Sequence, residues 1–223
     1  MPKGPALIFD LDGTLVDTAP DLLEAINFIL KAEGRAPVDR AALRHLVGHG
    51  ARAMMVEAFA MTGGPVEPGR LPGLLDRYIA HYRTHIADES RPFPGVEATL
   101  RRLSGAARLG VLTNKPQELT DLLLPALDLA RFFGAIHGAG RMEASKPDPR
   151  VFESVIAELG GPGAGAVMIG DSATDVATAR AAGAPVILVD YGYTPVPAGE
   201  LGADAVTGDF AEIPKLVERL LGL

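Results

Sequence analysis

Two acidic residues follow the first apolar segment of the sequence and offer a nucleophile with a proton donor beside it. The segment 5–12 is a short apolar run that ends in Asp10 and Asp12. This pattern is typical of a buried strand that runs into a loop. A carboxylate such as that of Asp10 can attack phosphorus and form an acyl phosphate. Asp12 can protonate the departing alkoxide and later take a proton from water.

Three later segments carry polar side chains directly after apolar stretches or before a helix. They are Thr113-Asn114-Lys115, Lys146-Pro147, and Gly170-Asp171-Ser172 with Asp175 one helical turn further on. Ligands of open parallel sheets bind at the carboxyl ends of the strands, so these segments are expected to meet there. Carboxylates at this density repel one another unless a cation joins them. Oxygen ligands without cysteine or clustered histidine favour Mg²⁺.

The same segments suit a phosphoryl group. The metal would neutralise phosphoryl oxygens, while Lys146 and Thr113 would stabilise the charge on the group being transferred. Gly13 lets the backbone approach closely, so its amide can bind a phosphate oxygen. The residues therefore favour metal-assisted chemistry on a small phosphorylated metabolite.

Strands and helices alternate in the second part of the chain. The spacing predicts strands over 108–114, 135–138, 166–171, 185–190 and 203–207, and helices over 96–103, 118–127, 150–159, 174–182 and 213–221. Near-continuous apolar strands in such an order predict a parallel sheet covered on both faces. We therefore expect an α/β fold with a doubly wound, Rossmann-like core.

The region between the first strand and this sheet is helical instead. Apolar residues recur at helical spacing from Leu22 to Leu30 until Gly34, and further helices are predicted over 41–47, 52–61 and 74–85. Breaker clusters at 62–65 and 68–72 separate them. We predict a core of residues 1–17 and 92–223 with a helical cap, 18–91, inserted into it. Asp17 is interpreted as a helix cap or hinge residue at this junction.

Composition excludes several function classes. The chain has 21 Lys and Arg against 28 Asp and Glu, a net charge of −7, which argues against nucleic-acid and anionic-membrane surfaces. It has no cysteine, which excludes disulfides and thiol nucleophiles. The N-terminus does not look like a signal peptide, and no apolar run is long enough to span a bilayer. We expect a cytoplasmic monomer or homodimer.

In their order, the four motifs resemble those of the haloacid dehalogenase-like phosphatases over the whole length of the chain. The matching segments are Asp10-Leu11-Asp12-Gly13-Thr14, Thr113-Asn114, Lys146-Pro147 and Gly170-Asp171-Ser172-Ala173-Thr174-Asp175. The resemblance implies that Asp10 is the nucleophile and a Mg²⁺ ligand, and that Asp12 is the acid and base. It implies metal contacts from the Asp12 carbonyl, Asp171 and Asp175. Thr113, Asn114 and Lys146 would hold the phosphoryl group.

Finer features resemble the phosphoglycolate phosphatase branch. They are the runs 17–22, 47–50, 113–115 and 191–193. The resemblance implies 2-phosphoglycolate as substrate, although N-acetylmuramic acid 6-phosphate phosphatases and pyrophosphatases of this branch look much alike. His49 and Arg52 in the cap are candidates to reach a substrate carboxylate. Lys115 is interpreted as a surface residue or a helix-start residue, or alternatively as a substrate contact.

Other functions remain open at this stage. A haloacid dehalogenase is disfavoured because the family's dehalogenases lack the second acid, which here is Asp12. A phosphosugar mutase would return the phosphate to a sugar and has the same motifs. A non-enzymatic sugar-phosphate-binding protein would be favoured by a missing nucleophile or metal acid, and neither is missing. His81 and His85 have the i, i+4 spacing of a metal pair, but no acid lies between them as in a zincin helix.

Overall fold

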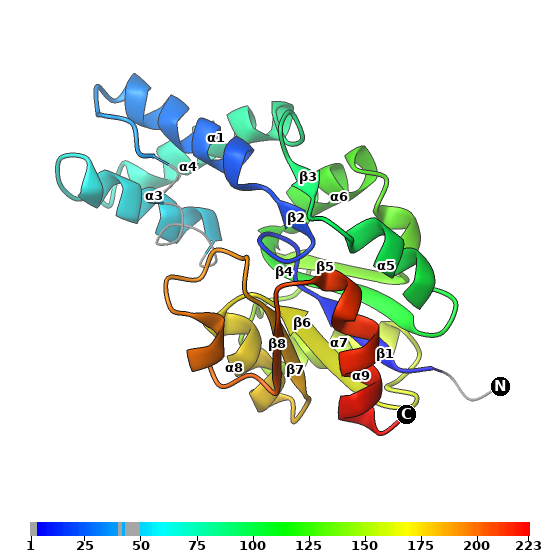
Figure 1. Cartoon of the computed structure of the whole chain (residues 1–223). Coiled ribbons are helices and arrows are strands. Elements are labelled where there is room, and N and C mark those ends of the chain that lie inside the picture. The colour runs from blue at the N-terminus through cyan, green and yellow to red at the C-terminus, as the bar shows by residue number, and fades with distance from the viewer. Residues whose placement is uncertain (1–3, 40–41, 43–49) are drawn as a thin grey trace.

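The core is a six-stranded parallel sheet, seen in the computed structural model that describes residues 4–39, 42 and 50–223 (Figure 1). In spatial order the strands are β5 (Ala135–Ala139), β4 (Arg108–Pro116), β1 (Ala6–Phe9), β6 (Ala166–Gly170), β7 (Val186–Val189) and β8 (Ala205–Thr207). The chain runs outward from β1 to β4 and β5, then crosses back to β6 on the other side. The strand order therefore reverses beside β1, which is where ligands bind in such folds.

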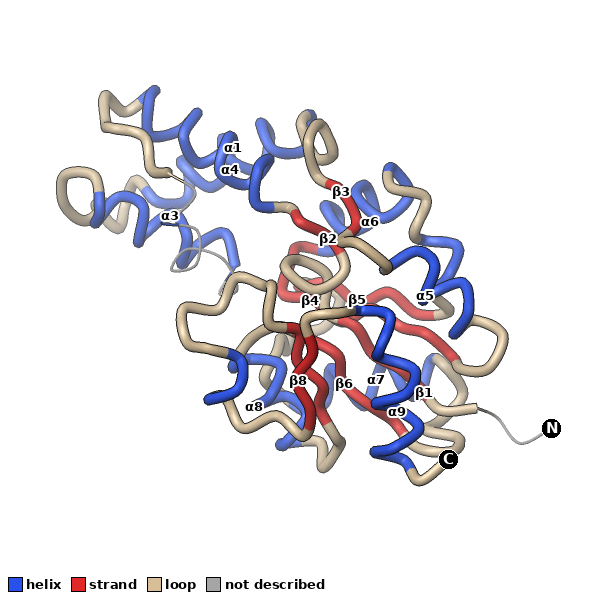
Figure 2. Tube along the Cα trace, viewed as in Figure 1, coloured by secondary structure: helices blue, strands red, loops and turns tan. Residues whose placement is uncertain are grey.

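Helices cover both faces of this sheet (Figure 2). They are α5 (Val96–Leu103), α6 (Gln117–Ala126), α7 (Pro149–Glu158), α8 (Ala173–Ala181) and α9 (Ile213–Leu221), with short 3-10 turns at Ala130–Phe132, Ala198–Glu200 and Phe210–Glu212. All four residues of β1 are buried, and they alternate between two hydrophobic clusters. Leu7 and Phe9 join the cluster that includes α5, α6 and α9, whereas Ala6 and Ile8 join that of α7 and α8. This two-sided burial explains the uninterrupted apolar strand.

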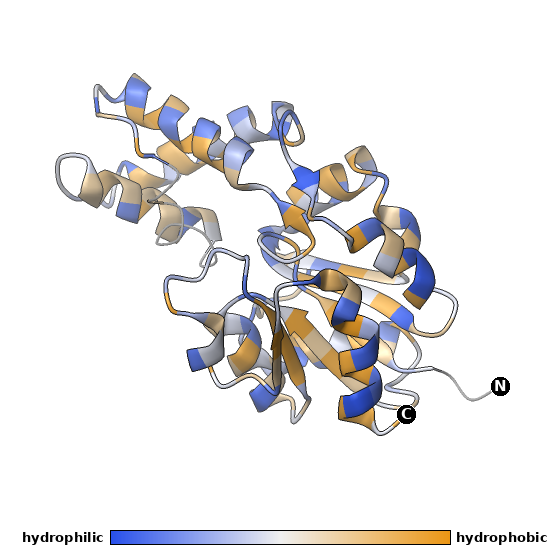
Figure 3. Cartoon of the chain, viewed as in Figure 1, coloured by the Kyte–Doolittle hydropathy of each residue, from blue (hydrophilic) through white to orange (hydrophobic). Residues whose placement is uncertain are grey.

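A second group of helices is inserted between β2 (Val16–Asp17) and β3 (Arg91–Pro92), which pair antiparallel. The group consists of α1 (Ala19–Ala32), α3 (Gly50–Met61) and α4 (Leu71–Thr84), and it lies apart from the helices that flank the sheet (Figure 1). Hydrophobic and polar residues alternate along α1 and α4 (Figure 3). In α3 hydrophobic residues are found on the buried and on the exposed side, where Val56 and Met61 lie. Tyr78 and Tyr82 of α4 are among its buried side chains.

The predicted fold class is confirmed, and the predicted strands and helices agree with the structure to within a few residues. The paired β2 and β3 were not predicted, because two-residue strands are too short to show a period. Pro72 was interpreted as a helix breaker but lies in the first turn of α4, where proline has no N–H bond to lose. The helix predicted over 41–47 falls almost entirely outside the described residues. The boundaries of core and cap stay a prediction.

None of the described helices combines the length and the apolar character that a bilayer span needs.

One buried carboxylate joins the two chain segments that connect core and cap. Asp21, in the first turn of α1, accepts hydrogen bonds from the backbone N–H of Ser90 at 2.8 Å and from its Oγ at 2.6 Å. It also accepts the N–H of Glu89 at 3.0 Å. Asp21 and Ser90 are both buried. The carboxylate therefore holds the outgoing and returning segments side by side.

We predict that Asp21→Ala lowers the free energy of unfolding by about 2–3 kcal/mol, because it leaves the buried donors of Ser90 without an acceptor. Denaturant titration would measure the loss. Asp21→Asn keeps one acceptor oxygen and should lose less. Asp76→Ala, at an exposed position of α4, is the control that should change little. Equal stability of Asp21→Ala and wild type would show that the segments do not depend on this carboxylate.

Candidate functional site

Strand register brings the motif residues together at the carboxyl end of the sheet. Phe9 in β1 lies beside Val111 of β4 and Ile169 of β6. The backbone N–H of Asp10 continues this pairing with a 2.8 Å bond to the carbonyl of Ile169. The next residues along the neighbouring strands lead to Thr113 and to Asp171. Parallel pairing alone thus places three of the predicted motifs at one edge of the sheet.

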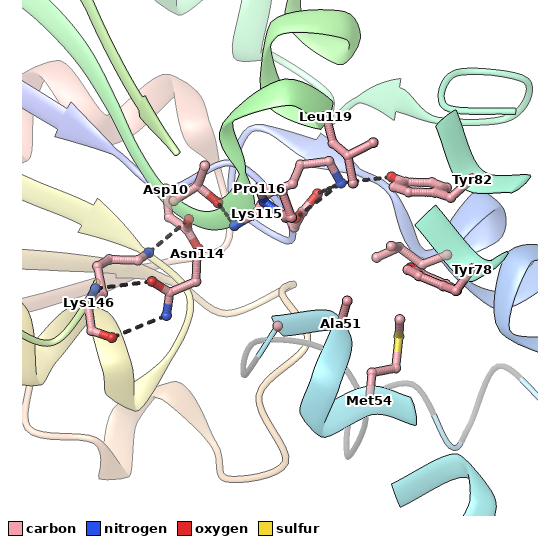
Figure 4. Close-up of a pocket in the computed structure, with 14 residues that line it drawn as sticks. Asp10, Ala51, Met54, Tyr78, Tyr82, Asn114, Lys115, Pro116, Leu119 and Lys146 are labelled. Carbon is pink, nitrogen blue, oxygen red and sulfur yellow. Dashed lines mark hydrogen bonds and ion pairs between the residues drawn. The ribbon is translucent and has the colours of Figure 1, made fainter. Parts of the chain in front are cut away.

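Three of the predicted acids form a buried cluster. Asp10, Asp171 and Asp175 each offer an oxygen, and these oxygens all lie within 4.8 Å of one another. Lys146 joins them, with its Nζ 2.8 Å from Asp10 Oδ1 (Figure 4). The same Nζ lies 2.7 Å from Asp175 Oδ1. The cluster therefore brings three carboxylates together around one buried ammonium group.

The excess of carboxylates over ammonium groups in this buried cluster shifts the pKa values of its members. Burial raises the pKa of Asp10 to about 6, against the opposing effect of Lys146. Burial, with Asp175 and Asp10 nearby, also raises the pKa of Asp171 well above its usual range. Burial alone would lower the pKa of Lys146, but Asp10 and Asp175 outweigh it, so its pKa is raised. Further positive charge at the site would favour the ionised forms of Asp10 and Asp171 and lower the pKa of both.

Backbone groups fix the orientation of the two later acids. Asp171 Oδ2 accepts the N–H of Tyr193 at 2.7 Å. Asp175 Oδ2 accepts the N–H of Asp171 and both the N–H and Oγ of Ser172, at 2.7–3.2 Å. The Ser172 contacts form a capping box that begins α8. Both carboxylates are thus oriented by hydrogen bonds from neighbouring protein groups.

The backbone comes unusually close to Asp171. A Cβ on Gly13 would lie 2.5 Å from Asp171 Oδ2, and a Cβ on Gly192 would lie 2.3 Å from the same oxygen. Gly13 also has φ of +87°, a conformation that glycine adopts without strain. Together with the buried all-oxygen donor set, this close packing fits a hard divalent cation.

Asp12 lies apart from the acid cluster. Its carboxylate contacts Lys115, with Nζ 3.1 Å from Oδ1 and 3.4 Å from Oδ2. Lys115 also donates to the hydroxyl of Tyr82, at 2.7 Å. The Lys115 side chain is only 2% exposed, so its interpretation as a surface residue is wrong. The ammonium group of Lys115 in β4 thus contacts both Asp12, from the loop after β1, and Tyr82, from the cap.

Asn114 positions the Lys146 segment rather than pointing at the acids. Its Oδ1 accepts the N–H of Lys146 at 3.1 Å, and its Nδ2 donates to the carbonyl of the same residue at 3.2 Å. Thr113 is buried and its Oγ1 accepts the N–H of Lys115 at 3.1 Å. Both line a pocket of about 60 Å³ together with Asp10, Asp12 and Lys146. That volume suits a small ligand.

The cap closes this pocket with mainly apolar side chains. Leu22, Met54, Tyr78 and Tyr82 line it from α1, α3 and α4. Sequence analysis missed them, because apolar and aromatic residues at helical spacing are indistinguishable from core residues. Their only signal is that they lie in the predicted insertion. Figure 4 shows Tyr82 directed towards Lys115, with Met54 and Tyr78 beside it.

Other predicted residues lie away from this pocket or outside the description. His49 lies outside the described residues. Arg52 is exposed on α3 and is not among the pocket-lining residues, so its role stays a prediction. Asp17 accepts the hydroxyl of Tyr193 at 2.7 Å and the N–H of Ala19 at 3.3 Å, which supports its interpretation as a residue of the helix start.

His81 and His85, the cap histidines among the described residues, have acidic partners. His81 contacts Glu24 and His85 contacts Asp88, at 2.7 and 2.8 Å. Neither residue belongs to the acid cluster.

Known proteins resemble the chain along nearly its whole length. Residues 7–189 match the family model of haloacid dehalogenase-like hydrolases. A phosphoglycolate phosphatase of Caulobacter vibrioides is 47% identical to this chain, and the match covers 98% of this chain and 93% of the relative's length. One from Agrobacterium fabrum is 45% identical over 99% of this chain and 95% of its own.

The fold is also that of a known crystal structure. A predicted phosphoglycolate phosphatase from Haemophilus somnus superposes with a TM-score of 0.88 and 28% identity, covering 97% of this chain and 99% of the other. The sequence match, the fold and the four motifs agree: the chain belongs to the haloacid dehalogenase-like hydrolase family.

Proposed function

We propose that this chain is a Mg²⁺-dependent phosphatase that hydrolyses 2-phosphoglycolate through a phosphorylated Asp10. The observation that carries the proposal is the buried cluster of Asp10, Asp171 and Asp175 around Lys146, at the carboxyl end of β1. The substrate is supported by the relatives named phosphoglycolate phosphatase, which match the chain over nearly their whole length.

The first half of the reaction transfers the phosphoryl group to the protein. A carboxylate oxygen of Asp10 attacks phosphorus, and the bond between phosphorus and the glycolate oxygen breaks. Asp12 donates a proton to that oxygen, so the ester oxygen leaves as the hydroxyl group of glycolate. Lys146, Thr113 and the amide of Gly13 stabilise the charge on the phosphoryl oxygens.

The second half regenerates the carboxylate. Asp12, now ionised, takes a proton from a water molecule that attacks the phosphorus of the aspartyl phosphate. The bond between phosphorus and the Asp10 oxygen breaks, and inorganic phosphate leaves. Asp10, Asp171, Asp175 and the carbonyl of Asp12 would hold Mg²⁺, which when bound reduces the repulsion between the phosphoryl oxygens and these acids.

The first measurement is phosphate release with Mg²⁺ or EDTA over a panel of esters. We expect metal-dependent release with the highest kcat/KM for 2-phosphoglycolate. A preference for N-acetylmuramic acid 6-phosphate or pyrophosphate would keep the mechanism and reject the substrate. Isomerisation of β-hexose 1-phosphates without phosphate release would identify a mutase. Binding of phosphosugars without turnover would identify a sugar-phosphate-binding protein.

Asp10→Asn should abolish turnover and leave the fold intact, because the change removes the nucleophilic charge but little volume. We expect a loss of at least about 10³-fold in kcat, with an unchanged circular dichroism spectrum. Asp76→Asn, at an exposed position of α4, is the matched control and should retain full activity. Wild-type rates in Asp10→Asn would reject the covalent mechanism.

Mg²⁺ should stabilise the protein through the acid cluster. The raised pKa values of Asp10 and Asp171 mean that the metal-free folded state binds protons more tightly than the unfolded chain. Its stability therefore falls as the pH rises from about 4 to about 6. Mg²⁺ removes this penalty, and we expect it to raise Tm by about 5 °C when near 100-fold above its Kd.

The shift should be larger at about pH 7.5 than at about pH 5, where protons compete with the cation. Differential scanning fluorimetry with MgCl₂ and with EDTA would measure it. Asp171→Asn should remove most of the shift. A Tm that does not respond to Mg²⁺ at the higher pH would contradict this metal site.

A further inference from the structure

The pocket contains a second buried cation that the proposed chemistry does not use. Lys146 pairs with the acids of the cluster, whereas Lys115 pairs with Asp12. Its side chain is 2% exposed, and burying an ammonium group is unfavourable unless acceptors surround it. Among the residues that the structure describes, its carboxylate partner is Asp12, which in the proposed reaction exchanges protons with the substrate. A cation placed there purely for stability would hold Asp12 away from that task.

The proposed contacts to both ends of the substrate come from one strand. Thr113 and Lys115 are two residues apart in β4, at a place where the pairing with β5 shifts register, and the Lys115 N–H bonds to Thr113 Oγ1 at 3.1 Å. Thr113 is proposed to contact the phosphoryl group, and Lys115 lines the same pocket. In 2-phosphoglycolate a single methylene separates the ester oxygen from the carboxylate. The phosphate and the carboxylate of this ester are therefore close together, as Thr113 and Lys115 are in the chain.

The surroundings of Lys115 favour an anion as its ligand. Tyr82 contributes its hydroxyl at 2.7 Å, and its ring centroid lies 4.6 Å from Nζ. The neighbouring pocket residues Met54, Tyr78 and Leu119 present mainly apolar surface (Figure 4). A carboxylate that enters between these walls and the strand end finds one strong partner, the ammonium group, in a place of low polarity.

We infer that Lys115, together with Tyr82 of the cap, binds the carboxylate of the substrate, and that Asp12 occupies this position until the substrate displaces it. The inference rests on the proposed function and extends it, because it assigns the residue that selects an acidic ester. Displacement leaves Asp12 next to the substrate carboxylate. The ester oxygen, two bonds from the carboxylate carbon, then lies close to the group that protonates it.

Two esters of similar size separate substrate selection from catalysis. They are 2-phosphoglycolate and 2-hydroxyethyl phosphate. The second ester has an uncharged hydroxymethyl group where the first has its carboxylate. We expect wild type to prefer the acid in kcat/KM, and Lys115→Met to lower that preference about 10- to 100-fold, the effect of losing one charge-assisted hydrogen bond. Lys31→Met, an exposed position of α1, is the matched control and should keep the wild-type preference.

Further variants test the same point without removing a buried charge. Lys115→Arg keeps the charge and should retain part of the preference. Tyr82→Phe removes only the hydroxyl and should lower the preference a few-fold. If Lys115→Met does not fold, Tyr82→Phe decides: a lowered preference supports the subsite, and an unchanged one rejects it.

The outcomes separate this inference from the proposed function. A wild-type enzyme that hydrolyses neither ester, or both equally well, would reject the proposed substrate and this subsite with it. A wild-type enzyme that prefers 2-phosphoglycolate, with a folded Lys115→Met that slows both esters by the same factor, would reject the subsite alone. In that case Lys115 supports the site structurally and the substrate assignment stands.

Discussion

The proximity of three buried carboxylates is the constraint on which the rest of the site depends. Asp10, Asp171 and Asp175 have one ammonium group, Lys146, among them. Such a cluster survives folding because neutral donors and close-packed backbone take the place of water around it. Tyr193 supplies one N–H, and Ser172 caps α8 while it holds Asp175. The repulsion among these carboxylates lowers the stability of the folded protein, and a bound metal ion would reduce that repulsion.

Topology explains why this cluster could be predicted from sequence. The acids follow apolar runs, and strands buried on both faces leave little freedom in how those runs pair. Once β1 lies between β4 and β6, residues 10, 113 and 171 must meet. The direction of Lys115 could not be predicted in this way, because it depends on Tyr82, which arrives from a separate group of helices. The same limit applies to Arg52, a candidate contact for the substrate carboxylate that is not among the residues lining the pocket.

Selection of the substrate and transfer of the phosphoryl group draw on the same strand. In the described part of the pocket, the cap contributes apolar side chains and tyrosines, and the lysines come from the core. Phosphate and carboxylate would therefore both contact residues of β4, Thr113 and Lys115, which line the same pocket. Two such contacts close together in one strand favour a short ester with charges at both ends.

Lys115 also links substrate binding to catalysis, because its Nζ contacts Asp12. An ammonium group in this environment needs an anionic partner in every state of the enzyme. Without substrate, Asp12 is that partner; with substrate, the proposed carboxylate replaces it and Asp12 becomes available for proton transfer. Tyr82 contacts the same Nζ, so the position of the cap is coupled to this exchange. A neutral ester cannot make the exchange, and it would leave Asp12 paired with Lys115. Discrimination against neutral esters would then arise from a misplaced acid as well as from weaker binding, and it would lower kcat as well as raise KM.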